Sequence, residues 1–386
     1  MNIIKADETY IAKTYARAPL LAESGHGARI IDAEGKEYID LGSGIGVNVF
    51  GACDPPWIAA VEAQLHKLQH LSNLYYTAPQ AELAEMLCMR TGFKKIFFAN
   101  SGAEANECAI KSVRKYSNEK YAPGRSTIIT LENSFHGRTM ATLSATGQTD
   151  MHVHFGPFLN GFKYAPANDF ATLKTLCDGT ICAIMLELIQ GESGVNPLDE
   201  NYVKQIAEFC QEQDILLIID EVQTGNGRTG SLYAYQHYGI MPDLITTAKG
   251  LAGGLPLGCA MLGEKLSNTL TPGSHGSTFG GNPIAAAGAI SILSRLDEPL
   301  FAEVKRKGNY IRAQLTDAKG IKNITGIGLM LGIETEKDAK FLSLECLKHG
   351  IIVLTAKNKL RLLPPLNISD KELAIAMQIL KGVLAE

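Results

Sequence analysis

Short apolar runs alternate with segments of helical periodicity through the middle of the chain. Four runs between residues 182 and 262 are almost continuously apolar: CAIMLEL, ILLIID, DLITTAK and LGCAML. Such runs are typical of strands that are covered on both faces of a sheet. Between the first two runs, apolar residues at 199–214 recur at the spacing of an amphipathic helix. Because strands separated by helices favour crossover connections, the pattern predicts an α/β doubly wound core with a mostly parallel sheet.

The same alternation extends toward the N-terminus. Helical periodicity at 57–70 and 102–116 alternates with strand-like runs at 95–100 and 126–131. These elements belong to the same predicted core.

From about residue 282 the order of elements changes. An Ala-rich segment at 282–296 predicts a buried helix, and a smaller α+β unit is expected to follow it. Its predicted helices lie at 300–317, 341–350 and 371–386, and its predicted strands at 326–335, 351–355 and 360–364. We therefore expect three parts: an N-terminal segment, 1–50, that joins the small domain through a hairpin at 28–41; a large domain, 51–275; and a C-terminal small domain, 276–386.

Composition narrows the class of protein. The 386 residues carry 36 Lys and Arg against 40 Asp and Glu, a formal charge of -4, and no long block of one sign. This balance favours neither a nucleic-acid nor a membrane partner. No apolar run approaches the roughly 20 residues that span a bilayer, and the first residues do not resemble a secretion signal. The eight cysteines form no CxxC pair. We therefore expect free thiols and a cytoplasmic location.

Three candidate chemical groups follow predicted strands. Asp220 and Glu221 end one apolar run, where a buried charge needs a partner. Lys249 ends another run and precedes a glycine-rich turn, and burial would favour its neutral, nucleophilic form. A helix beginning at Gly102 and Ala103 offers free amide groups to an anion. Because ligands bind at the carboxyl ends of parallel strands, these groups are expected to meet.

Each of these signals has a commoner structural explanation when it stands alone. Strand-end carboxylates often form ion pairs, a lysine before glycine is often in a solvated turn, and a small-residue helix start is often only a cap. Together they supply an anion cradle, an amine and a carboxylate. Pyridoxal 5'-phosphate needs such a set to hold its phosphate, its aldehyde and its ring nitrogen. His152 and His154 have no cluster of further ligands beside them, so no metal is expected.

The sequence resembles the class III (fold type I) aminotransferases over essentially the whole chain, and within them it is most similar to the acetylornithine aminotransferases. This resemblance implies a large domain with a mostly parallel sheet flanked by helices, a smaller α+β domain, and a homodimer with shared active sites. The matching blocks are TYARAPL, SNLYYTAPQAELAE, FFANSGAEANE, FHGRT, ELIQGESG, IIDEVQTGNGRTG, AKGLAGGLPLG, GSTFGGNP and LRLLPP.

The resemblance implies roles around the cofactor. Lys249 would hold pyridoxal phosphate covalently and move a proton between substrate and cofactor, while Asp220 would pair with the ring nitrogen. Phe135 would pack on the ring face, and Thr278 would reach the phosphate from the partner subunit. The implied cofactor-binding residues are Gly102, Ala103, Phe135, Asp220, Glu221, Val222, Gln223, Lys249 and Thr278.

It also implies how substrates bind. Arg138 would hold the carboxylate of acetylornithine, and Arg361 that of glutamate or 2-oxoglutarate. Glu192 would pair with Arg361 when an amine donor with a distal amino group is bound, and Ser277 would contact the substrate. The expected reaction is transfer of the terminal amine of N2-acetyl-L-ornithine to 2-oxoglutarate, in arginine biosynthesis.

Other interpretations stay open at this point. Ornithine, succinyl-diaminopimelate or 4-aminobutyrate could be the amine donor, because the chain departs from the usual pattern at Asp54, where relatives have histidine, and at 43–47. An isomerising enzyme of the same fold would not need an oxo acid. A catalytically silent relative would not need Asp220, Lys249, Arg138 and Arg361 together. A dinucleotide-binding oxidoreductase would need GxGxxG where this chain has NSGAEANE.

Overall fold

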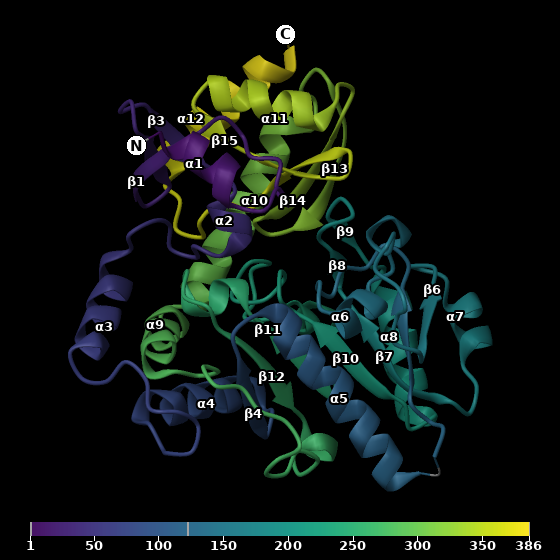
Figure 1. Ribbon diagram of the computed structural model, residues 1–386. Helices are drawn as coiled ribbons and strands as arrows, with labels where there is room; N and C mark the ends of the chain where they lie inside the picture. The colour runs from purple at the N-terminus through teal and green to yellow at the C-terminus, as the bar shows by residue number, and fades with distance from the viewer. Residues whose placement is uncertain (1, 122, 386) are drawn as a thin grey trace.

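The computed structural model describes residues 2–121 and 123–385, so the last residue of the predicted helix at 371–386 lies outside the described residues. A seven-stranded sheet forms its centre, in the order β4-β12-β11-β10-β7-β5-β6 (Figure 1). Only β12 runs antiparallel to its neighbours among these strands, which confirms the mostly parallel sheet. The strands are β4 (Lys95–Ala99), β5 (Thr127–Leu131), β6 (Phe162–Ala165), β7 (Ile181–Leu186), β10 (Leu216–Asp220), β11 (Leu244–Thr247) and β12 (Gly258–Leu262).

Both faces of this sheet are buried because successive side chains of each strand enter different cores. In β10, Leu217 and Ile219 pack in the core that includes helix α8, whereas Leu216 and Ile218 pack in the core that includes helix α5. This arrangement explains why the central strands are continuously apolar in sequence. Strand β6 has no such signal, because it lies at the sheet edge and only Ala165 in it is buried.

Helices cover the sheet and extend beyond its β4 edge. Helix α5 follows β4 and crosses β12 and β11 (Figure 1). Helix α9 packs on α3 and α4. The helices of this part are α3 (Pro55–Leu65), α4 (Ala78–Thr91), α5 (Gly102–Lys120), α6 (Met140–Ala145), α7 (Phe170–Leu176), α8 (Glu200–Glu212) and α9 (Pro283–Leu293).

Two smaller sheets lie with the C-terminal helices at one end of the molecule (Figure 1). One has the order β13-β14-β17-β16, and the other has the order β1-β2-β3-β15. Their elements are β1 (Ala22–His26), β2 (Arg29–Asp32), β3 (Glu37–Asp40), β13 (Ile321–Ile327), β14 (Met330–Thr335), β15 (Ile351–Ile352), β16 (Leu354–Ala356), β17 (Lys359–Leu362), α10 (Glu298–Leu315), α11 (Ala339–Lys348) and α12 (Asp370–Ala385).

Strand pairing connects the first part of the chain to the last. Strands β2 and β3 form the expected hairpin, and Ile39 of β3 pairs in parallel with Ile351 of β15. The prediction of one strand at 326–335 is wrong, because the chain turns there and the hairpin of β13 and β14 forms instead. Gly328, with a φ of 58°, makes this turn possible. The division at residues 50 and 275 stays a proposal.

Further short elements are α1 (Ile3–Tyr10), α2 (Ser43–Gly46), β8 (Ile189–Gln190) and β9 (Asn196–Pro197). Among the helices that the structure describes, none combines the length and apolar character needed to span a membrane. Within the same residues, no group of three or more His, Cys, Asp or Glu side chains is placed to hold a metal ion.

The contact between β12 and the start of α5 yields a prediction. Gly258→Ala should lower the free energy of unfolding by about 1 to 3 kcal/mol, the usual cost of overpacking, because a Cβ atom there would lie 2.4 Å from the Ser101 carbonyl oxygen. Denaturant unfolding of the apoprotein measures the change. Gly382→Ala is the control: its Cβ atom meets open space on α12, so a gain of about 0.5 to 1 kcal/mol is expected. Equal stability of the two variants would contradict the prediction.

Candidate active site

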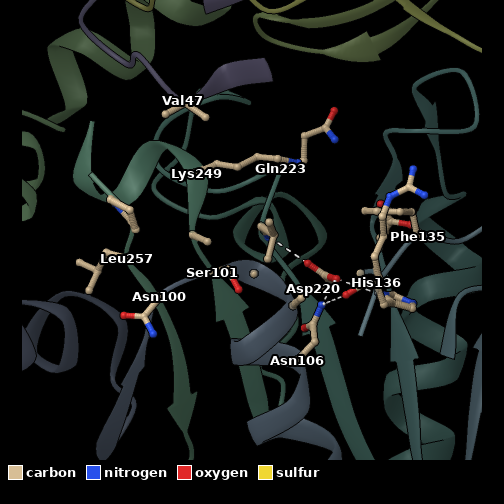
Figure 2. Close-up of a pocket in the computed structure, with 18 of the residues that line it drawn as sticks. Val47, Asn100, Ser101, Asn106, Phe135, His136, Asp220, Gln223, Lys249 and Leu257 are labelled. Carbon is tan, nitrogen blue, oxygen red and sulfur yellow. Dashed lines mark hydrogen bonds and ion pairs between the residues drawn. The ribbon is translucent and has the colours of Figure 1, made fainter. Parts of the chain in front are cut away.

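A cavity of about 460 Å³ opens at the carboxyl ends of β4, β10 and β11. Figure 2 shows side chains from these strand ends and from the loop after β5 turned toward one space. The cavity therefore brings together segments that are far apart in sequence. The residues that line it are Val47, Asn100, Ser101, Gly102, Ala103, Asn106, Phe135, His136, Gly137, Arg138, Glu187, Asp220, Val222, Gln223, Ala248, Lys249, Gly254, Leu255, Pro256 and Leu257.

Asp220 ends β10 at the base of this cavity and is only 4% exposed. Its Oδ2 atom accepts a hydrogen bond from Asn106 Nδ2 at 2.8 Å and lies 2.8 Å from His136 Nδ1 (Figure 2). The backbone N–H of Val222 donates to Oδ1 at 3.0 Å. The partner expected for this buried strand-end carboxylate is thus a histidine. Its position could not be read from sequence, because His136 is 84 residues away in the chain.

Glu221 turns away from the cavity, contrary to the implied cofactor role. Its carboxylate accepts hydrogen bonds from the N–H groups of Ala234, at 3.0 Å, and Tyr235, at 2.8 Å, and from the Thr224 hydroxyl. Burial raises the pKa of Glu221 to about 7. The reason for its direction is that successive side chains at a strand end point to opposite faces. Glu221 therefore supports the loop behind the cavity.

Lys249 follows β11 and begins the short 3-10 helix η3 (Lys249–Ala252). Its side chain extends across the cavity toward Gln223, above Asp220 (Figure 2). Burial lowers the pKa of Lys249 from its ordinary value of 10.5, while the nearby charge of Glu192 opposes the shift. A buried amine of this kind is more available as a nucleophile than a solvated lysine.

The N-terminus of α5 faces the same cavity. Ser101 caps the helix by accepting a hydrogen bond from Glu104 N at 3.1 Å, and Gly102 and Ala103 are its first residues. The first N–H groups of a helix have no partner within it and attract anions. A Cβ atom on Gly102 would lie 2.6 Å from a methyl carbon of Val222, so only glycine fits this close approach.

The two arginines have different surroundings. Arg138 lines the cavity, is exposed, and holds its guanidinium carbon 5.7 Å from the centre of the Phe135 ring. Arg361, 3% exposed on β17, donates to Glu192 Oε1 at 2.6 Å and to Gln223 Oε1 at 3.0 Å. Although burial acts in the opposite direction, Arg361 keeps the pKa of Glu192 below its usual value. The Arg361 charge is therefore neutralised, whereas Arg138 is open to a ligand.

Glu187 is a cavity residue that the sequence did not single out. It accepts hydrogen bonds from Phe135 N at 2.7 Å and Gly191 N at 3.4 Å. Burial and the neighbouring Asp220 raise the pKa of Glu187 well above its usual value. The only sequence signal was a carboxylate directly after the apolar run of β7. Glu187 thereby ties the loop of Phe135 to the loop of Glu192.

Ser277 and Thr278 do not line this cavity within one chain. Ser277 Oγ accepts a hydrogen bond from Asn100 Nδ2 at 3.2 Å, and Ser277 lines a separate cavity of about 380 Å³. Thr278 is exposed. The described chain alone therefore does not bring either residue to Lys249.

Comparison with known proteins agrees with this geometry. The fold is that of the pyridoxal-phosphate-dependent transferases, and residues 10–384 match aminotransferase class-III. The chain belongs to the class-III aminotransferase family and is a pyridoxal-phosphate-dependent aminotransferase.

Three relatives illustrate the similarity. The acetylornithine aminotransferase of Haemophilus ducreyi is 53% identical, with 100% of this chain and 99% of the relative covered. The crystal structure of N-acetylornithine aminotransferase from Stenotrophomonas maltophilia superposes with a TM-score of 0.86 at 36% identity, covering 99% and 98% of the two chains. The ornithine aminotransferase of Toxoplasma gondii gives a TM-score of 0.94 at 32% identity, covering 99% and 94%.

The residues present fit the family's cofactor. A buried amine at Lys249, a buried carboxylate at Asp220 and the start of α5 border one cavity. They match the aldehyde, the ring nitrogen and the phosphate of pyridoxal phosphate in chemical type. The donor set therefore agrees with the family assignment.

The burial of Lys249 yields a prediction for the apoprotein. Because its folded pKa is lowered, Lys249 destabilises the fold increasingly as the pH falls from 10.5 through the lowered value. Lys249→Met should raise the free energy of unfolding by about 1 kcal/mol at neutral pH, and the gain should fade toward pH 10.5. Denaturant unfolding across this pH range measures it.

The control is Lys340→Met, which replaces an exposed lysine on α11. Its effect should be within about 0.5 kcal/mol and should not vary with pH in the same range. A gain for Lys249→Met that stays constant up to pH 10.5 would contradict the assigned cause.

Proposed function

We propose that this aminotransferase moves the terminal amino group of N2-acetyl-L-ornithine to 2-oxoglutarate, giving N-acetyl-L-glutamate 5-semialdehyde and L-glutamate, a step of arginine biosynthesis. The observation that carries the proposal is the contrast between the open Arg138 and the Arg361 that Glu192 neutralises. This contrast suits one substrate with a carboxylate far from its reacting amine and another with a carboxylate next to it. Acetylornithine aminotransferases of several organisms are full-length relatives.

The proposed roles of the residues follow from their positions. Lys249 binds the cofactor and carries the proton between donor and acceptor atoms, because its amine is buried and its pKa is lowered. Asp220, held by Asn106 and His136, keeps a proton on the ring nitrogen. The bound cofactor supplies an electron sink for the carbanion that forms when a substrate proton leaves.

Walls of the cavity position the cofactor in this proposal. Phe135 packs on the ring face, and its backbone is tied to Glu187. Gly102 and Ala103 cradle the phosphate at the start of α5. Val222 and Gln223 complete the side of the cavity that follows β10.

Glu192 allows one site to accept two unlike substrates. While the distal amine of acetylornithine reacts, Glu192 holds Arg361 at 2.6 Å and Arg138 takes the α-carboxylate of the donor. When glutamate or 2-oxoglutarate binds, Glu192 swings away and Arg361 forms two parallel hydrogen bonds with the incoming carboxylate.

Assembly and location belong to the proposal as well. A homodimer would bring Thr278 of one chain to the phosphate site of the other, and Ser277 to the substrate. The positions of these two residues outside the single-chain cavity support this proposal. The eight cysteines are free, which supports the reducing cytoplasm as the compartment.

Ornithine as the amine donor is the second candidate. The structure of the ornithine aminotransferase from Toxoplasma gondii has a higher TM-score than that of the acetylornithine enzyme from Stenotrophomonas maltophilia. Succinyl-diaminopimelate and 4-aminobutyrate are further donors to compare.

The testing experiment measures absorbance of the purified holoenzyme as each amine is added separately. The cofactor band should bleach with glutamate, and most readily among amine donors with N-acetylornithine. Lys249→Ala should abolish turnover and retain the fold. If ornithine bleaches the band faster than N-acetylornithine, ornithine becomes the proposed amine donor. If Lys249→Ala still turns over, Lys249 is not the residue that binds the cofactor.

Glu192→Gln provides a prediction on substrate choice. The variant leaves Arg361 charged and without its carboxylate partner, so the ratio of kcat/KM for glutamate to that for N-acetylornithine should rise about tenfold, the factor expected for one charge-assisted interaction. Single-turnover half-reactions measure the two constants. An unchanged ratio would contradict the neutralising role of Glu192.

Arg138→Ala should act in a different way. It removes the guanidinium proposed to bind the donor carboxylate, so KM for N-acetylornithine should rise about tenfold or more while glutamate is affected less. Steady-state kinetics with each substrate varied separately tests this. A KM for N-acetylornithine equal to that of the unsubstituted enzyme would exclude Arg138 from the donor site.

A further inference from the structure

The turn that carries Lys249 is strained. Lys249 has a φ of 45°, in the left-handed region that residues other than glycine rarely adopt. Such a conformation persists only where the surrounding structure holds it firmly. The contacts on both sides of Lys249 therefore decide where its amine points.

Hydrogen bonds hold both ends of this turn. Before Lys249, Asn226 Nδ2 donates to the carbonyl oxygen of Ala248 at 3.1 Å. After it, the indole Nε1 of Trp57 donates to the carbonyl oxygen of Ala252 at 2.9 Å. Trp57 comes from α3, which is 195 residues away in sequence, so this second contact is purely tertiary.

The indole of Trp57 is wedged between two glycines. A Cβ atom on Gly253, which ends η3, would lie 3.0 Å from Trp57 Nε1, and a Cβ atom on Gly288 of α9 would lie 2.9 Å from it. Both positions leave only enough room for the ring. The position of the Lys249 turn therefore depends, through the indole, on the positions of α3 and α9.

An ion pair anchors the start of α3. Asp54 accepts hydrogen bonds from Arg295 Nη1 at 3.1 Å and Nη2 at 2.6 Å, and it also caps α3 by accepting from Trp57 N at 3.2 Å. Arg295 donates in addition to the carbonyl oxygen of Ser291, at the end of α9, at 2.8 Å. Asp54, which stands where relatives have histidine, thus has Arg295 as its partner. The Asp54–Arg295 pair connects the start of α3, which carries the indole, to the end of α9.

We propose that Trp57 is a positioning residue for Lys249, with the Asp54–Arg295 pair holding its indole in place against the Ala252 carbonyl. This inference rests on the proposed role of Lys249 as the residue that binds the cofactor. Trp57 acts through the turn and does not line the cavity that contains Lys249. It therefore controls the geometry of the amine and leaves substrate contacts alone.

The test is Trp57→Phe, which keeps an aromatic ring and removes the only indole donor. In the variant loaded with pyridoxal phosphate, the pH midpoint of the change in the bound cofactor's absorbance band should shift by about half a unit or more. Turnover number should fall about tenfold, the factor expected for loss of one hydrogen bond. KM for both substrates should stay within about twofold.

Val61→Ala is the matched control. Val61 lies on the same helix and faces the same glycine, with a methyl carbon 3.4 Å from the Cβ position of Gly288, but it makes no hydrogen bond to the turn. It should lower the melting temperature without moving the absorbance midpoint. If Trp57→Phe behaves in the same way, with midpoint and turnover number unchanged, the proposal is overturned.

Asp54→Asn is the second variant. It weakens the pair with Arg295 and leaves the indole present, so a smaller shift of the midpoint in the same direction is expected. An unchanged midpoint and turnover number would overturn the proposal even if Trp57→Phe does not fold. If Lys249→Ala retains the cofactor band, both the site assignment and this inference fail. If the absorbance midpoint shifts in the Trp57 and Asp54 variants and not in Val61→Ala, both are supported.

Discussion

The site depends on the burial of charged groups at the carboxyl edge of a parallel sheet. A charge in such a place is costly unless partners compensate it. Asp220 is compensated by His136, Asn106 and the Val222 amide, and these partners come from three different segments. The loop after β5, the start of α5 and the end of β10 must therefore meet for the carboxylate to be stable. The requirement that stabilises Asp220 also builds the cavity.

The charged groups at the cavity are only partly paired with one another. Glu192 sits against Arg361, and Gln223 joins them, while the Arg138 guanidinium lies over the edge of the cavity near Phe135. The neighbouring Glu187 lies close to Asp220, and burial together with the Asp220 charge raises the pKa of Glu187. The result is a site with one neutralised arginine and one available arginine, which suits two substrates whose carboxylates lie at different distances from the reacting amine.

Much of the fold was predictable because local pattern and burial agree in the central sheet. Continuous apolar runs at β7, β10, β11 and β12 reflect strands covered on both faces. Prediction failed where tertiary contacts override pattern. β6 is a half-exposed edge strand, and the expected single strand at 326–335 is split by a turn at Gly328. Asp220 and Glu221 are adjacent acids at the same strand end, but their side chains point in different directions. The sequence alone does not show which of the two faces the cavity.

The sequence by itself determined the chemical groups, their order and the class of enzyme, because strand ends, a lysine before a glycine-rich turn and a helix start are local features that motifs preserve. The tertiary structure decided which groups meet. The structure joins residues that are 33 to 195 positions apart in the chain. It pairs His136 with Asp220, places Glu187 near Asp220, and brings Trp57 against the Lys249 turn. Such pairings depend on how helices and strands pack against one another. A local sequence pattern does not show which distant segment will pack beside it.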